Sequence, residues 1–381
     1  MGFTSLGFFC FFPIIYLLYL AVPSKLRVLW LLIASYGFCI SFGVSYALIL
    51  LLSTLATWLA AIAVEKCGSY AYGRWIIGAV VLFHVLLLCF FKYGSRNPVL
   101  PVGISFYTFQ AIGYLLDVAR GTVRAERNVI RFGMFQAFFP KLVQGPIERS
   151  DSLLCQIRSL DKKKLLDESR IREGSLLLLW GLFQKLMVAD RIAIPVNAVY
   201  GQFGAFGGVE ILLVTLLYAF QIYCDFSGYT CMARGIAKLC GIELMENFRR
   251  PYLSLSVREF WHRWHISLST WLRDYIYISL GGNRKGRWRK YVNIMLTFLI
   301  SGIWHGTGFH FLLWGCMHGA IQILETLWQR APKAIRWLLA FGFVDLSCIL
   351  FVIGNESFQK RTCFHCFCFH FIVPDFLCFF H

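Results

Sequence analysis

Residues 46–64 read YALILLLSTLATWLAAIAV and contain no charged side chain. A transmembrane helix needs about 20 mostly apolar residues to cross the hydrocarbon core, so this stretch predicts one. Comparable apolar stretches recur along the chain, separated by short polar interruptions. They cover residues 8–22, 28–42, 75–91, 102–118, 175–188, 209–223, 291–303, 309–327 and 335–352. Together they predict an all-α, polytopic membrane protein with about ten transmembrane helices.

The composition supports the same class and excludes a soluble protein. Hydrophobic residues make up 58% of the 381 residues and charged residues 15%, and the mean hydropathy is +0.63. A soluble domain has roughly a quarter of its residues charged. The 37 phenylalanines and 12 tryptophans are typical of lipid-facing helices and of aromatic belts at the membrane surface. The lipid bilayer is therefore the first predicted partner.

The formal net charge of +17 does not indicate nucleic-acid binding. The cationic residues lie in short loops between apolar stretches, as topology determinants beside anionic lipid do, and not on one polar module. Loops one, three and five are the basic ones. This bias predicts that they face the cytoplasm and that the N-terminus lies outside, although Lys92 and Arg96 in loop four run against it.

Two segments do not fit a simple series of spans. Residues 132–143 are apolar but short and contain Pro140, which indicates a re-entrant or interfacial segment. Residues 225–290 are mixed polar, aromatic and basic, and predict interfacial helices along the cytoplasmic face. Trp261, Trp264 and Trp271 are expected at the level of the lipid headgroups.

A histidine within the apolar series is the strongest candidate for chemistry. Residues 301–308 read SGIWHGTG and place His305 between two apolar stretches. A single histidine is more often a satisfied core residue, but ionisable residues in a membrane are functional candidates by default. The flanking Gly302, Gly306 and Gly308 allow a close backbone approach or a break in the helix. If residue 291 enters from the cytoplasm, His305 lies roughly 20 Å into a core about 30 Å thick.

A second cluster, residues 258–273, reads REFWHRWHISLSTWLR. His262 and His265 are three residues apart, which predicts that they share one helix face. Such a pair suits a metal, but a third ligand would have to come from elsewhere, for example His310. Zinc sites take three or four protein ligands, so we predict that no metal is bound. An interfacial helix explains the tryptophans and arginines but not the histidines.

These motifs resemble the membrane-bound O-acyltransferase family, and in particular its bacterial alginate O-acetylation branch. The D-alanine transfer proteins of teichoic acids are more distantly similar. The resemblance rests on the 258–273 stretch and on WHG at 304–306, and it covers about residues 101–319. Further matching motifs are YIYISLGGNR at 275–284, PVGISFYTFQ at 101–110, QGPIER at 144–149 and YCDFSGY at 223–229.

The resemblance implies an enzyme of the bacterial cytoplasmic membrane with many spans. It implies transfer of an acyl group, most simply acetyl, from a cytoplasmic thioester to a hydroxyl of a cell-envelope polysaccharide or to an intermediary acetyltransferase. No bound cofactor is implied, and acetyl-CoA or an acyl carrier would be a co-substrate. The essential histidine of the family falls on His305. His265 falls where eukaryotic members carry asparagine, and His262 where this branch has arginine, so only His305 and His265 are implied as catalytic.

The chemistry of these residues agrees with such a reaction. A neutral imidazole at His305 can take the proton of the acceptor hydroxyl as its oxygen attacks the thioester carbonyl, and burial keeps the imidazole neutral by lowering its pKa. His265 can orient His305 or donate a hydrogen bond to the developing oxyanion. A basic loop can hold the phosphates of a donor, or it can be a topology signal only. The loop contains Arg284, Lys285, Arg287, Arg289 and Lys290.

Three further charged residues, Asp190, Arg191 and Asp225, lie at the ends of apolar stretches and are expected to be caps or ion pairs. We divide the chain into a membrane domain, residues 1–355, and an atypical tail, residues 356–381. The tail contains Cys363, His365, Cys366, Cys368 and His370. These are zinc-ligand types, but their alternation with phenylalanine is not a usual zinc spacing. Because the similar proteins continue with further spans, we expect a truncated or frameshifted end.

Two alternatives from other functional classes remain at this point. One is a transporter or channel for a polysaccharide precursor, to which only residues 132–143 point. The other is a scaffold that recruits a separate envelope acetyltransferase and has no chemistry of its own. The sequence leaves open the acceptor glycan, the acyl group, and whether coenzyme A or a carrier protein supplies it.

Overall fold

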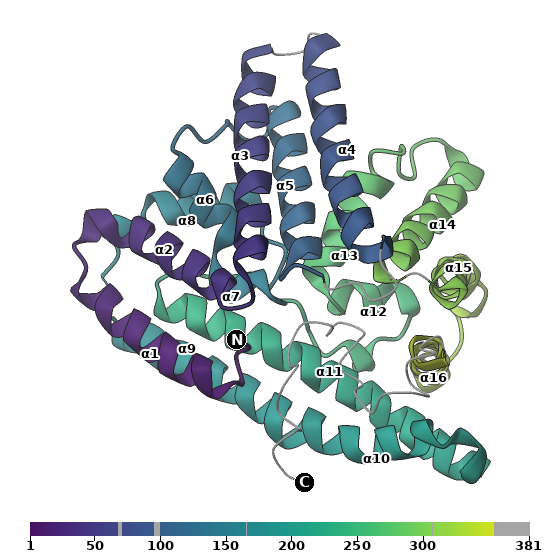
Figure 1. Cartoon of the computed structure of the whole chain (residues 1–381). Coiled ribbons are helices and arrows are strands. Elements are labelled where there is room, and N and C mark those ends of the chain that lie inside the picture. The colour runs from purple at the N-terminus through teal and green to yellow at the C-terminus, as the bar shows by residue number, and fades with distance from the viewer. Residues whose placement is uncertain (68–70, 95–99, 165, 307, 354–381) are drawn as a thin grey trace. The chain divides into compact units, whose positions relative to one another are not determined.

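The computed structural model describes residues 1–67, 71–94, 100–164, 166–306 and 308–353, and every element in these ranges is a helix (Figure 1). The described residues form two compact units. The first comprises residues 1–179 and 231–244, and the second comprises 180–230 and the described residues from 245 onward. The predicted all-α class is therefore confirmed. The division between a membrane domain at 1–355 and a tail remains a prediction, and the tail lies outside the described residues.

The first unit is built from the N-terminal helices. They are α1 (Leu6–Ala21), α2 (Arg27–Ile40), α3 (Val44–Cys67), α4 (Ala71–Tyr93), α5 (Ile104–Ala119), α6 (Val129–Ala137), α7 (Phe139–Leu142), α8 (Ser150–Arg158) and most of α9 (Glu168–Leu182). The bounds of α1 to α5 follow the apolar stretches read from the sequence to within a few residues, whereas α9 begins and ends well before the stretch at 175–188, and no stretch predicts α8. Three-residue 3-10 turns at Ser24–Leu26 and Leu160–Lys162 connect neighbours.

The second unit contains the C-terminal helices. They are α10 (Asp190–Gly201), much of α11 (Gly208–Leu239), α12 (Val257–Arg263), α13 (Ile266–Leu272), α14 (Gly286–His305), α15 (Phe309–Leu324) and α16 (Lys333–Ile353). π-helical segments lie at Phe183–Ala189 and Arg273–Tyr277. Short 3-10 turns lie at Phe203–Ala205, Pro251–Leu253 and Glu325–Trp328.

Among the described residues, three helices are long and apolar enough to cross a membrane: α3, Tyr72–Tyr93 of α4, and α11. The count of about ten spans is therefore not confirmed. Several of the other apolar helices are short. The 14 residues of α2, for example, extend only about 21 Å at the rise of an α-helix, less than the hydrocarbon core.

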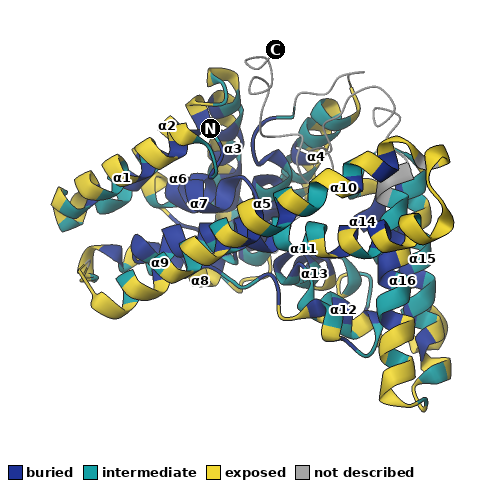
Figure 2. Cartoon of the chain, turned by 90° about the horizontal axis from the view of Figure 1, so that it is seen from below, coloured by how far each residue is buried: buried dark blue, intermediate teal, exposed yellow. Residues whose placement is uncertain are grey.

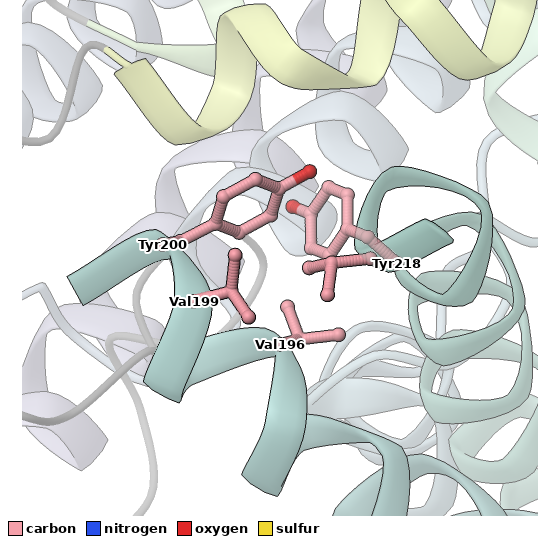
Figure 3. Close-up of a cluster of buried hydrophobic side chains, with 5 residues drawn as sticks. Val196, Val199, Tyr200 and Tyr218 are labelled. Atoms are coloured by element: carbon pink, nitrogen blue, oxygen red, sulfur yellow. The ribbon is translucent and has the colours of Figure 1, made fainter. Parts of the chain in front are cut away.

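Apolar side chains on the outside of the helices suit a lipid environment. Exposed residues recur along α1, α10 and α16 (Figure 2). They include the large leucines Leu17 on α1 and Leu338 on α16, and Leu48 is exposed on α3. Inside the second unit, α10 and α11 instead bury a cluster (Figure 3) that contains Val196 and Tyr218. Helices such as α3 and α10 thus have one side that packs within the protein and one outward side with exposed apolar residues.

The predicted interruption of residues 132–143 is present. The chain turns out of helical geometry at Phe138, between α6 and α7, and Pro140 lies in the first turn of α7. Both helices are largely buried within the first unit. Lys141, at the end of α7, is buried and donates to Gln110 Oε1 at 2.6 Å and to the Gln136 carbonyl at 3.1 Å. Whether this segment re-enters the bilayer remains a prediction.

One expectation for residues 225–290 was wrong. Residues 225–239 do not form separate helices but continue α11, which is 32 residues long. The sequence did not predict this continuation because the charged Asp225 interrupts the apolar stretch. Its carboxylate lies 2.7 Å from the ammonium of Lys185 within the second unit. Pairing removes the cost of placing the carboxylate inside an apolar helix, so the helix continues. The short helices begin only after residue 250.

Helices α14 and α15 form a closely packed hairpin in the second unit. Glycines stand where the two backbones meet. A Cβ on Gly302 would collide with the carbonyl oxygen of Phe311, and one on Gly315 would lie 2.5 Å from the carbonyl oxygen of Phe298. Small residues are the usual means by which membrane helices approach closely. The hairpin places the end of α14, where His305 lies, against α15.

We expect Gly302→Ala to separate α14 from α15 and to reduce stability by about 1–3 kcal/mol, because an added methyl group has no space there. The measurement is the thermal unfolding midpoint of the purified protein in detergent. Gly342→Ala, in α16 of the same unit, is the matched control, since its Cβ meets nothing within 4 Å. Equal midpoints for the two variants would contradict the close packing of the hairpin.

Candidate active site

The backbone leaves helical geometry between α12 and α13, and His265 lies at this break. Its φ is 43° and ψ is 54°, in the left-handed region that side chains rarely adopt. Asn247 holds the turn: its carbonyl accepts from Ile266 N at 3.0 Å and its Oδ1 accepts from Ser267 N at 3.1 Å. A strained backbone that is held by its surroundings is frequent at functional sites.

The break corrects one sequence-based expectation. His262 and His265 do not share a helix face, because α12 ends at Arg263 and His265 precedes α13. The ring of His265 lies edge-on to Phe226 at 4.7 Å between centroids, and 3% of the residue is exposed. Burial lowers the pKa of His265 to about 3, so its imidazole is neutral.

A cavity of about 370 Å³ lies beside these helices in the second unit. Its polar and charged walls are Arg258, His262, Ser269, Thr270, Arg273, Asn283, Lys290, Thr297, Ser301 and Gln322. Its apolar and aromatic walls are Trp261, Ile266, Leu268, Leu272, Tyr277, Ile294 and Phe298. Three of the lining residues, Arg258, Arg273 and Lys290, are basic, and no lining residue is a carboxylic acid. The cavity is thus suited to an anionic group attached to an apolar or amphipathic chain.

The electrostatics of the cavity affect His262 as well. Burial lowers the pKa of its imidazole, and the nearby Arg273 and Arg258 lower it further. Arg273 also donates to Asp274 Oδ1 at 2.8 Å, so part of its charge is balanced. The sequence assigns His262 no catalytic role, and the structure places it in the cavity wall.

His305 ends α14, and Gly306 after it is extended. The ring of Phe311 fills the place that a Cβ on Gly306 would occupy, so the close approach predicted from the glycines is present here. The His305 ring is edge-on to Trp304 at 4.7 Å and to Trp314 at 5.1 Å between centroids. Ser301 lies one helical turn before His305 on the same face of α14 and lines the cavity.

An aromatic contact connects the cavity wall to His305. Trp261 lines the cavity, and its ring centroid lies 5.6 Å from that of Trp314, which in turn meets His305. A third buried histidine belongs to the same group. His318 accepts a hydrogen bond on Nδ1 from Trp261 Nε1 at 3.2 Å, and its Nε2 lies 3.0 Å from Ser347 Oγ.

His318 lies in the run WGCMHG at 314–319, which follows the His305 motif, but the sequence alone assigns it no role. The available signal was its spacing: it follows Trp314 by four residues, which places both on one face of α15. Its partners could not be found in the same way, since Trp261 and Ser347 belong to α12 and α16. The described contacts of His265 and His305 are with aromatic neighbours, and their proposed pairing remains a prediction.

The basic loop is only partly connected to the cavity. Lys290 lines it, whereas Arg284, Lys285, Arg287 and Arg289 are exposed. The loop therefore contributes one cation to the wall, and the rest of it fits the topology signal considered above.

The ion pairs expected of the aspartates are present in the second unit. Lys185 Nζ lies 2.7 Å from Asp190 Oδ1 and 2.7 Å from Asp225 Oδ1. The same ammonium lies 5.7 Å from the ring centroid of Tyr229. Asp225 is inside α11 and does not cap a helix, so the alternative reading of it as a cap was wrong.

A possible metal site finds no support among the described residues, where no three histidine, cysteine or acidic side chains gather as ligands. His310, considered as a third ligand, lies in the first turn of α15 against Phe311. The cysteines and histidines of the tail lie outside the described residues.

The sequence is similar to several known proteins. Residues 128–364 match the family model of the membrane-bound O-acyltransferases. A probable alginate O-acetylase of Pseudomonas fluorescens is 37% identical over 375 residues, 95% of this chain and 74% of that protein. A peptidoglycan O-acetyltransferase of Helicobacter pylori is 31% identical over 94% of this chain and 78% of its own length. A teichoic acid D-alanyltransferase of Streptococcus thermophilus is 28% identical over 64% and 60%, respectively.

The matched region includes α12 to α15, and with them the cavity, His265 and His305. The alginate O-acetylase is similar over nearly the whole chain, and the family model covers more than half of it. The chain belongs to the membrane-bound O-acyltransferase family.

Proposed function

We propose that this membrane O-acyltransferase moves an acetyl group from a cytoplasmic thioester to a hydroxyl of a cell-envelope polysaccharide, with His305 as the general base. The observation that carries the proposal is the position of the cavity. Its walls contain the cation Lys290 and, further along α14, Ser301, which lies one helical turn from His305. A donor bound there would have its acyl end near the base.

The chemistry of the walls favours a phosphorylated donor. Arginine and lysine side chains bind phosphate oxygens through charge-assisted hydrogen bonds. Lys290 and Ser301 both lie on α14, about 16 Å apart along its axis at the rise of an α-helix. An extended phosphopantetheine arm can span such a distance. Coenzyme A and acyl carrier proteins share this arm, so the proposal covers both donors, and acetyl-CoA is the simpler one.

The proposed reaction needs one group that both accepts and returns a proton. The neutral imidazole of His305 takes the proton of the acceptor hydroxyl while the hydroxyl oxygen forms a bond to the thioester carbonyl carbon. The tetrahedral intermediate then breaks its carbon–sulfur bond, and the imidazolium returns the proton to the leaving thiolate. General base catalysis of this kind contributes about 10²–10⁴-fold to the rate.

His265 is proposed as a partner that stabilises the developing oxyanion or orients His305. Its imidazole is neutral and therefore carries one N–H group, which is a hydrogen-bond donor. A preorganised donor in a water-poor site stabilises a developing oxyanion far more than it would in water. The rigid turn made by Asn247 would hold this donor in place.

The acceptor is proposed from what the similar proteins have in common. Their names refer to alginate, peptidoglycan and teichoic acid. Each is a polymer of the bacterial envelope or of the material exported through it. We therefore propose the bacterial cytoplasmic membrane as the location, and an envelope polysaccharide or an intermediary acetyltransferase as the acceptor of the acyl group.

The first test is His305→Ala in cells that express the protein, with the ester content of the envelope polysaccharide as the readout. We expect a loss of about 10²-fold or more, because the general base is removed. His310→Ala, in the first turn of α15, is the control and should retain acylation. Unchanged ester content at a normal protein level would contradict the proposal and favour a scaffold or a transporter.

The second test concerns donor binding. We expect Arg273→Gln and Lys290→Gln each to raise the KM for acetyl-CoA about tenfold with little change in kcat, since a lost phosphate contact weakens ground and transition states alike. Arg287→Gln is the control, because Arg287 belongs to the same basic loop but does not line the cavity. The cavity is not the donor site if Arg287→Gln raises KM by the same factor.

The third test separates backbone geometry from side-chain chemistry at His265. Asparagine tolerates the left-handed conformation and carries an N–H donor, so we expect His265→Asn to keep activity within about tenfold. His265→Ala lacks the donor and should lower kcat by a further 10²-fold or so. Steady-state kinetics of the purified variants give both values. If His265→Ala is as active as His265→Asn at equal thermal stability, His265 has no role in the reaction.

A further inference from the structure

We propose that His318 is a positioning residue for acyl transfer, which holds Trp261 and Trp314 and, through Trp314, fixes the ring of His305. The inference rests on the proposed function, in which His305 is the base. It concerns a residue that does not itself touch the reacting groups.

The hydrogen bonds of His318 determine its tautomer. The indole N–H of Trp261 can only donate, so Nδ1 of His318 must be an acceptor without a proton. In the neutral ring Nε2 then carries the hydrogen and donates it to Ser347 Oγ. The Ser347 hydroxyl in turn donates to the carbonyl of Val344 at 2.7 Å, which leaves its oxygen lone pairs available. In this tautomer each donor in the series of hydrogen bonds therefore meets an acceptor.

These bonds exclude a proton-transfer role for His318. Both ring nitrogens are occupied by protein groups, and only 1% of the residue is exposed. A general base needs a free nitrogen within reach of the proton that it removes. What the imidazole can do is fix geometry, because it joins three helices at one point: α12 through Trp261, α16 through Ser347, and its own α15.

The ring contacts carry this geometry to His305. The centroid of the His318 ring lies 4.6 Å from that of Trp314, one turn earlier on α15. Trp314 meets the His305 ring edge-on at 5.1 Å. On the other side, Phe343 of α16 is edge-on to His318 at 5.0 Å. A close-packed interior transmits displacement, so a shift of the His318 ring moves Trp314 and with it the surface against which His305 rests.

The same histidine also determines the position of one cavity wall. Trp261 lines the cavity and contacts Trp314 at 5.6 Å. His318 therefore fixes the indole beside the proposed donor and the indole beside the base in one arrangement. This arrangement would set the distance between the donor carbonyl and the base. A misplacement of about 1 Å can lower the rate by about 10²-fold.

The test uses two amides that each keep one half of the imidazole. His318→Asn places an acceptor near Nδ1 and keeps the bond from Trp261. His318→Gln places its amide near Nε2, so Trp261 loses its acceptor. We expect His318→Gln to lower kcat about 10–100-fold with the KM for acetyl-CoA unchanged, and His318→Asn to stay within about threefold of the wild-type kcat. If His318 had only a structural role, the kcat of each variant would fall in proportion to the decrease in its thermal unfolding midpoint.

A double-mutant cycle adds a second measurement in case His318→Gln does not fold. Trp261→Phe keeps an aromatic ring and removes the N–H, and we expect it to lower kcat as His318→Gln does. Combined, the two should lower kcat no further than either alone, because they remove one interaction. Trp337→Phe is the matched control: its indole also donates a hydrogen bond, to the Tyr252 carbonyl at 2.8 Å, but outside the cavity.

Equal losses of kcat in His318→Asn and His318→Gln would overturn the positioning role, as would additive losses in the double variant. His305→Ala measured in the same assay distinguishes the two proposals. If it is inactive while His318→Gln and Trp261→Phe keep the wild-type kcat, only the positioning role fails. If His305→Ala is active, the proposed function fails, and the inference that rests on it fails too.

Discussion

Several of the buried charged and polar groups in this protein are paired with a partner from the same chain, because their surroundings are apolar. Without water, an unsatisfied donor or charge costs several kcal/mol. Lys185 is balanced by Asp190 and Asp225, Lys141 donates to Gln110 and to a backbone carbonyl, and the imidazole of His318 is bonded on both nitrogens. These pairings let charged and polar residues sit inside a chain that is mostly hydrophobic. They also determine which side chains remain available for chemistry.

The candidate site lies where helices stop. His265 occupies a left-handed turn between two seven-residue helices, and His305 is the last residue of α14 before an extended glycine. In a regular helix the backbone groups form hydrogen bonds with one another, and the side chains face the neighbouring helices. At a break the surrounding contacts must hold the backbone that the helix no longer holds. Asn247 and the Phe311 ring provide those contacts.

Membership of the family defines the reaction class, and the cavity suggests how this chain carries it out. Cations and hydroxyls share its walls with aromatic rings, and it approaches His305 from the side of Ser301. Aromatic packing then joins Trp261 in the wall to Trp314 beside the base. In the proposed mechanism, donor binding and the geometry of the base would therefore depend on the same buried group of rings, where α12, α15 and α16 meet.

The sequence by itself determined the helical class, most helix positions, the interruption near Pro140 and the close backbone approach at the glycines beside His305. Those features depend on local periodicity and on glycine or proline, which act within a few residues. Only the tertiary structure decided that residues 225–239 continue α11, that His262 and His265 do not share a helix face, and that His318 contacts Trp261 and Trp314. Each of these depends on a partner far away in the chain: Lys185 for Asp225, Asn247 for the turn at His265, and Trp261 with Ser347 for His318. Such partners leave no local pattern, because packing and pairing between helices are set by the fold as a whole.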